Sequence, residues 1–466
     1  MAGVQDTSSA FELITGRNAL RSLALGGGVA LHAINVYVVT TIMPSVVRSI
    51  GGLSYYAWST TLFVVASILG SAASYRLIER MGPRRAYLAG LALFCAGSVG
   101  CASAPAMAWL LAGRTVQGLG GGVLLALSYA LIRMVYEPRL WARALAFVSA
   151  MWGVATLSGP ALGGWFASMG WWRPAFLSLL PLAAVLAWLV GRLVPAGAPA
   201  SASGGRIPWG KLLLLAGSVL AISVGGLSHE LWWNGAGVAA GLALAWAMAR
   251  LDRDASAPLL PAGAYSARAV LGANYLTMAL LVIGLTSEIY VPYFLQVLHA
   301  YAPLAAGYLT AVMAGGWTLA ALMYAGRTGA SAARLVRGGP IVTAVALAAL
   351  AVLVPYTGGK GWPAAAALVL ALTGVGFGIG MCWSHMVTRV FRSAPAGQEN
   401  LASGSVTTVQ LYAIALGAAI AGMVANAAGL AEPGGVEGAR SAAVWLFGSF
   451  ALIPAVAVWS ARAAAR

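Results

Sequence analysis

The sequence has little charge: Asp, Glu, Lys and Arg together make up 8% of its 466 residues. Hydrophobic residues make up 61%, and a soluble domain with this balance lacks the polar surface that water requires. Only three cysteines occur, and their spacing fits neither a zinc site nor a disulfide framework: Cys95, Cys101 and Cys382. The composition therefore argues against a soluble protein and predicts an all-α membrane protein.

The sequence also lacks the residue clusters that catalysis needs. We find no paired carboxylates and no metal-ligand cluster within an apolar segment, and no P-loop pattern for ATP-driven pumping. The glycine-rich stretch Gly374-Val-Gly-Phe-Gly-Ile-Gly380 lies in an apolar segment without a preceding strand, so we interpret it as helix packing. We therefore expect no enzyme, no cofactor and no bound metal.

Fourteen apolar segments come close to the roughly 20 residues that a helix needs to cross a bilayer. They are residues 20–44, 56–77, 87–104, 108–131, 143–167, 173–193, 211–228, 235–250, 269–296, 304–325, 339–356, 363–388, 403–426 and 441–461. The seventh and eighth are the least distinct and could form one re-entrant hairpin. Breaks rich in small residues and proline, at 195–208 and 250–261, divide the segments into six, two and six.

This grouping predicts three parts of the chain. Residues 1–196 form a six-helix bundle, 197–262 a linker with two accessory transmembrane helices, and 263–466 a second six-helix bundle. If both termini are cytoplasmic, few of the 27 basic residues lie outside: Arg48, Arg173, Lys360 and Arg440. That asymmetry predicts a multi-pass inner-membrane protein whose basic cytoplasmic face meets anionic lipid. The charges are dispersed over many loops, so we expect no nucleic-acid binding.

Two segments are candidates for gating movements. The short loop after the second span contains Glu79, Arg80, Gly82, Arg84 and Arg85, and such a loop can lock helix bundles through ion pairs that a neutralised charge releases. The alternative is a basic loop that only sets topology. The fifth span carries a proline among small residues, which combine a local bend with close helix approach: Gly153, Gly159, Pro160, Gly163 and Gly164.

The order of these motifs resembles the major facilitator superfamily, in particular its fourteen-span drug:proton antiporter branch. Pro44 closes the first span, Arg114-Thr-Val-Gln117-Gly118 lies in the fourth, and Gly153–Gly164 resembles the signature of exporters. Tyr293–Gly307 and Ala402-Ser403-Gly404 resemble later signatures. The resemblance covers nearly the whole chain and implies alternating access between two bundles, with the Glu79–Arg85 loop as a cytoplasmic gate. Glu79 and Tyr75 replace the aspartate and the leading glycine of the family's loop.

Arg114 is the only arginine inside a span in this assignment. A charge there is energetically costly, so the side chain should face protein or water and have a partner. Arg114 and Gln117 share one helical stripe, which we expect to line the bundle interior. The resemblance implies that Arg114 takes part in a proton-coupled rearrangement; the alternative is a structural arginine bound by backbone carbonyls.

Glu288 is the only carboxylate placed well inside the membrane, about 30 Å along its helix from Arg268. At helical spacing, Glu288 shares one face of its span with other residues, and we expect this stripe to face a cavity. The stripe comprises Asn274, Thr277, Gly284, Glu288, Pro292 and Gln296. Desolvation disfavours the charged carboxylate, so such a group can exchange protons near neutral pH, and it could also bind a cationic substrate. We predict that Glu288 couples the two fluxes; the alternative is a structural glutamate bonded to Tyr or Ser neighbours.

Asn35 departs from the family, where an aspartate commonly stands nine residues before the first-span proline. An amide does not exchange a proton, so coupling rests on Glu288 or is absent. His32, one turn earlier, titrates near neutrality and could substitute, although a lone histidine in a membrane is more often a packing residue. The same applies to His385. The remaining predicted cavity residues are Gln117, Asn274, Thr277, Tyr290, Gln296, Trp152, Trp317 and Gln410, with the aromatic ones as a possible wall for amphiphilic compounds or as interface anchors.

These features predict a secondary active transporter that exports amphiphilic organic compounds or drugs in exchange for protons. Asn35 and Arg114 leave open a proton-independent or importing carrier of a neutral or anionic metabolite. A receptor or scaffold built on a carrier fold, without flux, is a more remote alternative. The expected partners are a small-molecule substrate, protons and membrane lipids.

Overall fold

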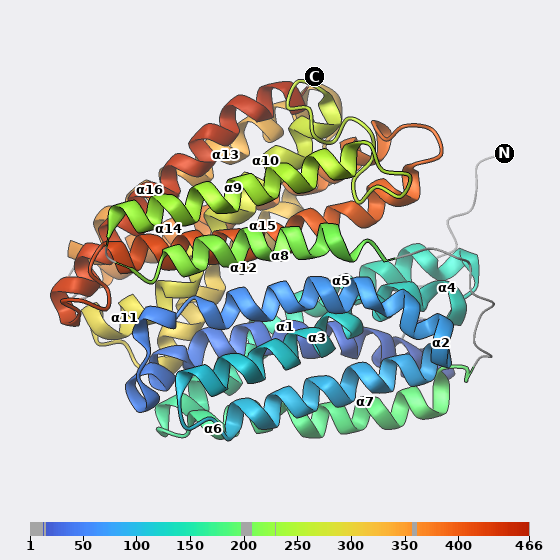
Figure 1. Ribbon diagram of the computed structural model, residues 1–466, viewed down its shortest axis with the longest axis horizontal. Coiled ribbons are helices and arrows are strands. Elements are labelled where there is room, and N and C mark those ends of the chain that lie inside the picture. The colour runs from blue at the N-terminus through green and yellow to red at the C-terminus, as the bar shows by residue number, and fades with distance from the viewer. Residues whose placement is uncertain (1–12, 14, 197–206, 229, 357–360, 466) are drawn as a thin grey trace. The chain divides into compact units, whose positions relative to one another are not determined.

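The fold is known from a computed structural model that describes residues 13, 15–196, 207–228, 230–356 and 361–465. Within these ranges the regular structure consists of α-helices and short 3₁₀ helices, without a strand (Figure 1). The chain divides into two compact units, Met1–Ile42 with Ala66–Ile207, and Met43–Val65 with Pro208–Arg466. The last turns of the first helix and the first turns of the second therefore belong to the second unit.

The first unit is built from the N-terminal helices. They are α1 (Gly16–Ile50), α2 (Trp58–Ala102), α3 (Met107–Ala130), α4 (Ile132–Val135), α5 (Trp141–Ser168), α6 (Trp172–Leu177) and α7 (Leu179–Leu193). The second unit holds α8 (Trp209–Gly225), α9 (Leu231–Arg253), α10 (Val270–Leu285), the 3₁₀ helix η4 (Thr286–Tyr290), α11 (Val291–His299), α12 (Pro303–Tyr324), α13 (Gly329–Tyr356), α14 (Trp362–Arg392), α15 (Glu399–Ala427) and α16 (Gly435–Ala464).

Eleven helical segments in the described part of the chain are long and apolar enough to cross a membrane. One of them, Leu53–Ala102, is 50 residues long and contains two of the predicted spans. The predicted accessory spans correspond to α8, which has only 17 residues, and to α9, which is not among the eleven. Many transmembrane helices are thus present, but fourteen spans are not confirmed.

The bend in the long segment lies at Gly82. Its φ of 79° and ψ of 164° are not helical, and a side chain there would be strained. Pro83 follows, and its fixed φ suits the first position of a new helix. Two spans predicted from the sequence therefore join through a single left-handed residue, with no separate loop.

Glycines let the helices pack closely in both units. In the first unit, a Cβ added at Gly120 would lie 2.6 Å from the carbonyl oxygen of Gly90. In the second, a Cβ added at Gly378 would lie 2.6 Å from the carbonyl oxygen of Gly339 in α13, and one at Gly380 would overlap the backbone of Trp317 in α12. The glycines of 374–380 therefore serve helix packing, as the sequence predicts.

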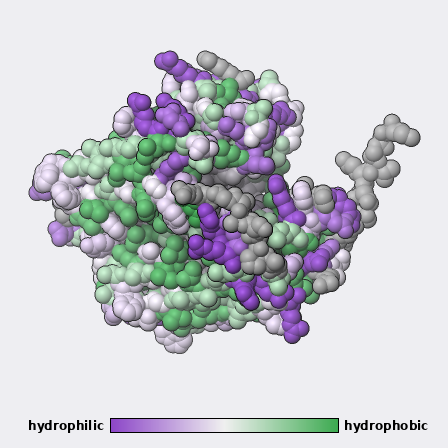
Figure 2. All heavy atoms as spheres, turned by 45° about the vertical axis from the view of Figure 1, so that its right-hand side comes forward, coloured by the Kyte–Doolittle hydropathy of each residue, from purple (hydrophilic) through white to green (hydrophobic). Residues whose placement is uncertain are grey.

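The surface of the protein carries many large apolar side chains. Leu242 and Trp246 of α9 are each 62% exposed, and Leu322 of α12 is 79% exposed. Figure 2 shows broad hydrophobic areas on the face seen there, with hydrophilic residues gathered in patches. Such a surface suits lipid better than water.

The helices α8 and α9 pack on each other, and α8 also packs on α15, within the second unit. Gly225 faces Gly237 closely enough that a Cβ added to Gly225 would lie 2.9 Å from the Gly237 Cα. The hydroxyls of Ser218 in α8 and Tyr412 in α15 are 2.9 Å apart. Both helices therefore belong to the second unit, and α8 connects them to α15.

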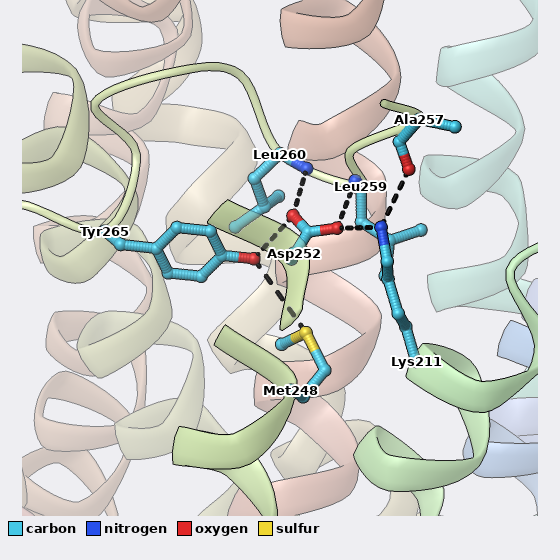
Figure 3. Close-up of polar contacts among 7 residues, drawn as sticks. All are labelled: Lys211, Met248, Asp252, Ala257, Leu259, Leu260 and Tyr265. Atoms are coloured by element: carbon cyan, nitrogen blue, oxygen red, sulfur yellow. Dashed lines mark hydrogen bonds and ion pairs between the residues drawn. The ribbon is translucent and has the colours of Figure 1, made fainter. Parts of the chain in front are cut away.

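A buried carboxylate fixes the loop between α9 and α10. The Lys211 ammonium of α8 donates to Asp252 Oδ1 over 2.8 Å, and the Tyr265 hydroxyl donates to Oδ2 over 2.8 Å (Figure 3). The backbone amides of Leu259 and Leu260 donate to the same carboxylate over 2.7 and 3.1 Å. Burial alone would raise the pKa of Asp252, but the hydrogen bonds from Lys211 and the other donors outweigh it and lower this pKa.

Because the pKa of Asp252 is lowered in the folded protein, we expect the free energy of unfolding to depend on pH. A folded-state pKa below the usual value stabilises the folded protein above about pH 4, and the contribution is lost as the pH falls through the lowered value. Asp252→Asn should therefore destabilise the protein by on the order of 2 kcal/mol near neutral pH and by less in acid. Thermal unfolding from pH 3 to 7 measures this, with the exposed Asp254→Asn as control. A difference from wild type that does not shrink in acid would contradict the assignment.

Candidate functional site

The first unit contains a buried polar network around Arg114 on α3. The Arg114 guanidinium donates to the side-chain oxygen of Gln117, one turn further along the helix. The Gln117 amide nitrogen in turn donates to the Ser98 hydroxyl of α2 over 2.8 Å. All three side chains are almost fully inaccessible to solvent. The predicted stripe of Arg114 and Gln117 thus faces the interior of this unit.

His32 and Asn35 lie on α1, one turn apart, and both are buried. His32 hydrogen-bonds to the backbone of Gly121 in α3, and its ring packs edge-on against Trp152 of α5, with centroids 6.1 Å apart. The side-chain nitrogen and oxygen of Asn35 have no hydrogen-bond partner among the described residues. A buried amide without partners is energetically unfavourable, so Asn35 is a candidate for binding a ligand group or a different partner in another state.

The predicted gating loop is anchored within the first unit. The Arg76 and Glu79 side chains approach to 3.7 Å, and Glu79 is buried although Arg80 and Arg85 are exposed. The Arg84 guanidinium donates to the carbonyl oxygen of Val194, just beyond the end of α7, over 2.8 Å. A positive charge at a helix C-terminus is favourable, because the helix dipole is negative there. In the structure these residues form the bend of α2 at Gly82, and Glu79 and Arg84, on either side of the bend, have partners within the first unit.

The glycine- and proline-containing segment of α5 packs on α1. A Cβ added at Gly159 would overlap the Cβ of Tyr37, and one at Gly163 would lie 2.8 Å from the Val38 carbonyl oxygen. Pro160 and Gly164 are also buried, whereas a Cβ at Gly153 would meet nothing within 4 Å. The segment is thus in close contact with α1 at Gly159 and Gly163, whereas there is open space beside Gly153.

In the second unit, the helix around Glu288 is interrupted. Thr286–Tyr290 form the 3₁₀ helix η4 between α10 and α11. Pro292 has no N–H to donate to the Glu288 carbonyl oxygen four residues earlier, and the backbone N–H of Val291 donates to it instead. The Thr286 and Ser287 hydroxyls donate back to the carbonyl oxygens of Ile283 and Gly284. Glu288 therefore lies in a short 3₁₀ stretch, which we call the helix break, within the continuous helical segment Val270–His299.

Glu288 is half-buried as a residue, and its carboxyl group makes no hydrogen bond or ion pair with any other described residue. The rest of its predicted stripe behaves differently. The Thr277 hydroxyl lies 2.7 Å from that of Ser460 in α16, and a Cβ added at Gly284 would lie 3.4 Å from Pro454. Asn274 is fully buried. In this structure Thr277 and Gly284 pack on α16, and the cavity role expected for this stripe stays a prediction.

Aromatic rings follow Glu288 along the chain. Tyr290 stacks on Tyr56 with centroids 4.8 Å apart and on Phe294 with centroids 5.9 Å apart, and all three are fully buried. Close by, the Arg48 guanidinium donates to the side-chain oxygen of Gln296 over 3.2 Å. Within the second unit, the end of α1 and the start of α2 are thus attached to η4 and α11.

The other predicted cavity residues lie further along the second unit. Trp317 of α12 packs on Trp383 of α14, with ring centroids 5.0 Å apart, and both are half-buried against the hydrophobic core that contains Cys382. His385 is buried and Gln410 is half-buried. The predicted residues of the first unit therefore lie around Arg114, whereas those of the second unit are spread over α10, η4, α11, α12, α14 and α15.

Sequence reasoning missed three residues of the second unit: Arg48, Tyr56 and Asn426. The Asn426 amide nitrogen donates to the carbonyl oxygens of Ser54 and Gly226, each over 2.9 Å, and so joins α15 to η2 (Leu53–Tyr55) and α8. The sequence did contain a signal for Arg48. Arg48 lies four residues after Pro44, and its partner Gln296 lies four residues after Pro292, so the two polar residues have the same spacing from a proline. Nothing in the local sequence marks the partners of Asn426.

Comparisons with known proteins agree with this architecture. The Major Facilitator Superfamily profile matches residues 25–418. A Mycobacterium tuberculosis protein named "probable multidrug-efflux transporter" is 38% identical over 461 residues, which cover 97% of this chain and 96% of that protein. "Multidrug resistance protein 3" of Bacillus subtilis is 24% identical, over 85% of this chain and 77% of its own.

Solved structures show the same fold. A bacterial homologue of the human lysosomal transporter Spinster has a TM-score of 0.66 at 16% identity and covers 97% of each chain. A D-xylose–proton symporter also has a TM-score of 0.66 at 16% identity, over 95% of this chain and 98% of its own. At these identities the likeness concerns the fold alone.

Proposed function

Because the chain belongs to the Major Facilitator Superfamily, and is thus a membrane-embedded transporter, we propose that it exports amphiphilic organic compounds in exchange for protons. The relatives named as multidrug-efflux or multidrug-resistance proteins support the substrate class. We further propose that it spans the inner membrane fourteen times, with α8 and α9 as two of the spans and both termini cytoplasmic. The placement of basic residues in the sequence supports this topology.

Glu288 is the proton carrier in this proposal, and its position in the chain is the observation that supports the role. A carboxyl group at a helix break, without a fixed partner among the described residues, is free to exchange one partner for another. Protonation removes its charge, and deprotonation creates a site for a cationic substrate group. Mutually exclusive binding of the proton and the substrate then makes the export of one require the uptake of the other.

The network around Arg114 is proposed to respond to the substrate. Arg114 holds a fixed positive charge next to Gln117, and Asn35 offers an unpaired donor and acceptor. Such amide groups recognise neutral polar atoms of a substrate, whereas the surrounding apolar side chains and Trp152 accept its hydrophobic part. His32 is bonded to Gly121 and takes the role of positioning Trp152.

Gating is assigned to the Glu79–Arg85 loop and to the contact of α5 with α1. The ion pair of Arg76 with Glu79 and the bond from Arg84 to Val194 fix the loop in the state seen here. Movement of the bundles between two access states would break and remake such contacts.

Asn35 favours a second candidate function, a carrier of a neutral or anionic metabolite without proton coupling. The first span has an amide where the family has a carboxylate, and Arg114 could bind an anion. In that case the flux would follow the substrate gradient alone.

Dye transport in liposomes tests the proposed function. The purified protein is reconstituted with a fluorescent amphiphilic cation, such as ethidium, and a pH gradient is imposed across the membrane. We expect accumulation of the dye against its gradient, and its loss when a protonophore collapses the pH gradient. Transport that is equally fast with and without the gradient would favour the uncoupled carrier.

A further inference from the structure

Outside the candidate transport site, a surface pocket lies at the end of α9. It has a volume of about 470 Å³ and lies between the last turn of α9 and the loop that leads to α10. Its lining combines apolar groups with polar ones, including Pro258, Leu260, Arg253, Tyr265 and Gln398. Arg253, the last residue of α9, lines the pocket, and the exposed apolar residues Leu242 and Trp246 lie on earlier turns of the same helix.

The charges at this pocket favour an anion. The Asp252 carboxylate also lines it, but Lys211, Tyr265 and two backbone amides already bind both of its oxygens. Arg253 is exposed and has no ion pair with any residue in the described ranges. Arg250, one turn earlier, is also exposed. Arg253 in the lining of the pocket and Arg250 one turn before it therefore present two exposed positive charges to a phosphate.

The outward face of α9 continues from these arginines into an apolar stripe. Leu242, Trp246, Arg250 and Arg253 follow one another at helical spacing, and all four are exposed. The Arg250 guanidinium lies over the Trp246 ring, 5.0 Å from its centroid. The stripe from Leu242 to Arg253 is about 16 Å long, comparable to much of an acyl chain. Tryptophan and arginine together are typical of the boundary between headgroups and hydrocarbon.

We propose that this surface binds one anionic glycerophospholipid. Its phosphate lies at Arg250 and Arg253, its polar headgroup enters the pocket beside Tyr265 and Gln398, and an acyl chain follows Trp246 and Leu242. The lipid would cover the joint between α9 and α10, and α10 leads directly into the segment that carries Glu288. A hydroxyl-bearing headgroup such as phosphatidylglycerol suits the polar lining of the pocket.

Lipid binding to the purified full-length protein tests this inference without any transport assay. Native mass spectrometry and thermal unfolding are compared in detergent with phosphatidylglycerol or with phosphatidylcholine of identical acyl chains. We expect a retained phosphatidylglycerol and a higher unfolding temperature, neither of which phosphatidylcholine produces. The double variant Arg250→Gln with Arg253→Gln should bind phosphatidylglycerol about tenfold more weakly or worse, because each basic residue near the headgroups contributes to anionic-lipid affinity.

Controls separate this site from general charge and from a free anion. Arg334→Gln removes an exposed arginine from α13 and should keep the full lipid effect. Trp246→Leu should weaken binding but keep the preference for phosphatidylglycerol. Equal lipid binding by the double variant and by wild type would overturn the inference. The inference would also be overturned if Arg334→Gln lost as much phosphatidylglycerol binding as the double variant. The same conclusion would follow if inorganic phosphate alone raised the unfolding temperature as much as phosphatidylglycerol does.

Discussion

Glu288→Gln is expected to abolish transport against a gradient while leaving the protein folded and inserted. Glutamine has nearly the shape of a protonated glutamate, so the break between α10 and α11 remains, but the side chain no longer releases a proton. Because the Glu288 carboxyl group makes no ion pair in the described structure, its neutralisation leaves no buried charge unpaired. The variant should retain the exchange of substrate down its gradient.

Dye accumulation under an imposed pH gradient measures this effect. The inside-to-outside dye ratio of the variant should fall to about 1, because no free energy passes from the proton to the substrate. Glu437→Gln, a change at an exposed residue in the first turn of α16, serves as the matched control and should accumulate dye normally. Wild-type accumulation by Glu288→Gln would remove this residue from the coupling mechanism.

Gly159→Leu has the second-largest expected effect. Even a Cβ at this position overlaps the Cβ of Tyr37, so a leucine must push α5 away from α1. Overpacking of this kind costs about 1–3 kcal/mol, and the displaced helix can no longer make the close contact. We expect a properly inserted but slow transporter, with turnover reduced about tenfold.

The control for Gly159 lies in the same helix. A Cβ at Gly153 meets nothing within 4 Å, so Gly153→Leu adds the same side chain in open space. Initial transport rates, normalised to the amount of inserted protein, compare the two variants. Similar rates in both would mean that the contact of α5 with α1 has no part in the transport cycle.

Much of the helical architecture follows from the sequence. Long apolar segments must be helical in a bilayer, because each backbone group needs an internal partner, and the first span at 20–44 corresponds to α1. One boundary between the two compact units, between Ile207 and Pro208, falls in the break at 195–208, whereas the assignment of Met43–Val65 to the second unit has no signal in the sequence. The number of spans is harder to predict, because Gly82 bends a helix without ending it and α8 is only 17 residues long.

The surroundings of the site residues are less predictable. An ideal helix places Thr277, Gly284 and Glu288 on one stripe, but the 3₁₀ segment changes the rotation per residue exactly where the stripe reaches Glu288. The partners of Asp252 and Asn426 come from segments remote in sequence, such as Lys211 and Ser54. Local patterns carry no information about such pairs, so these contacts become visible only in three dimensions.

Direct measurement of protons tests the central claim most closely. In weakly buffered detergent solution, a pH-sensitive dye reports protons that the protein releases when an amphiphilic cation is added. Our account predicts release by wild type, at a pH where the Glu288 carboxyl group is protonated, and none by Glu288→Gln with the cation still bound. Equal proton release by the two proteins, or transport by wild type without any release, would contradict it.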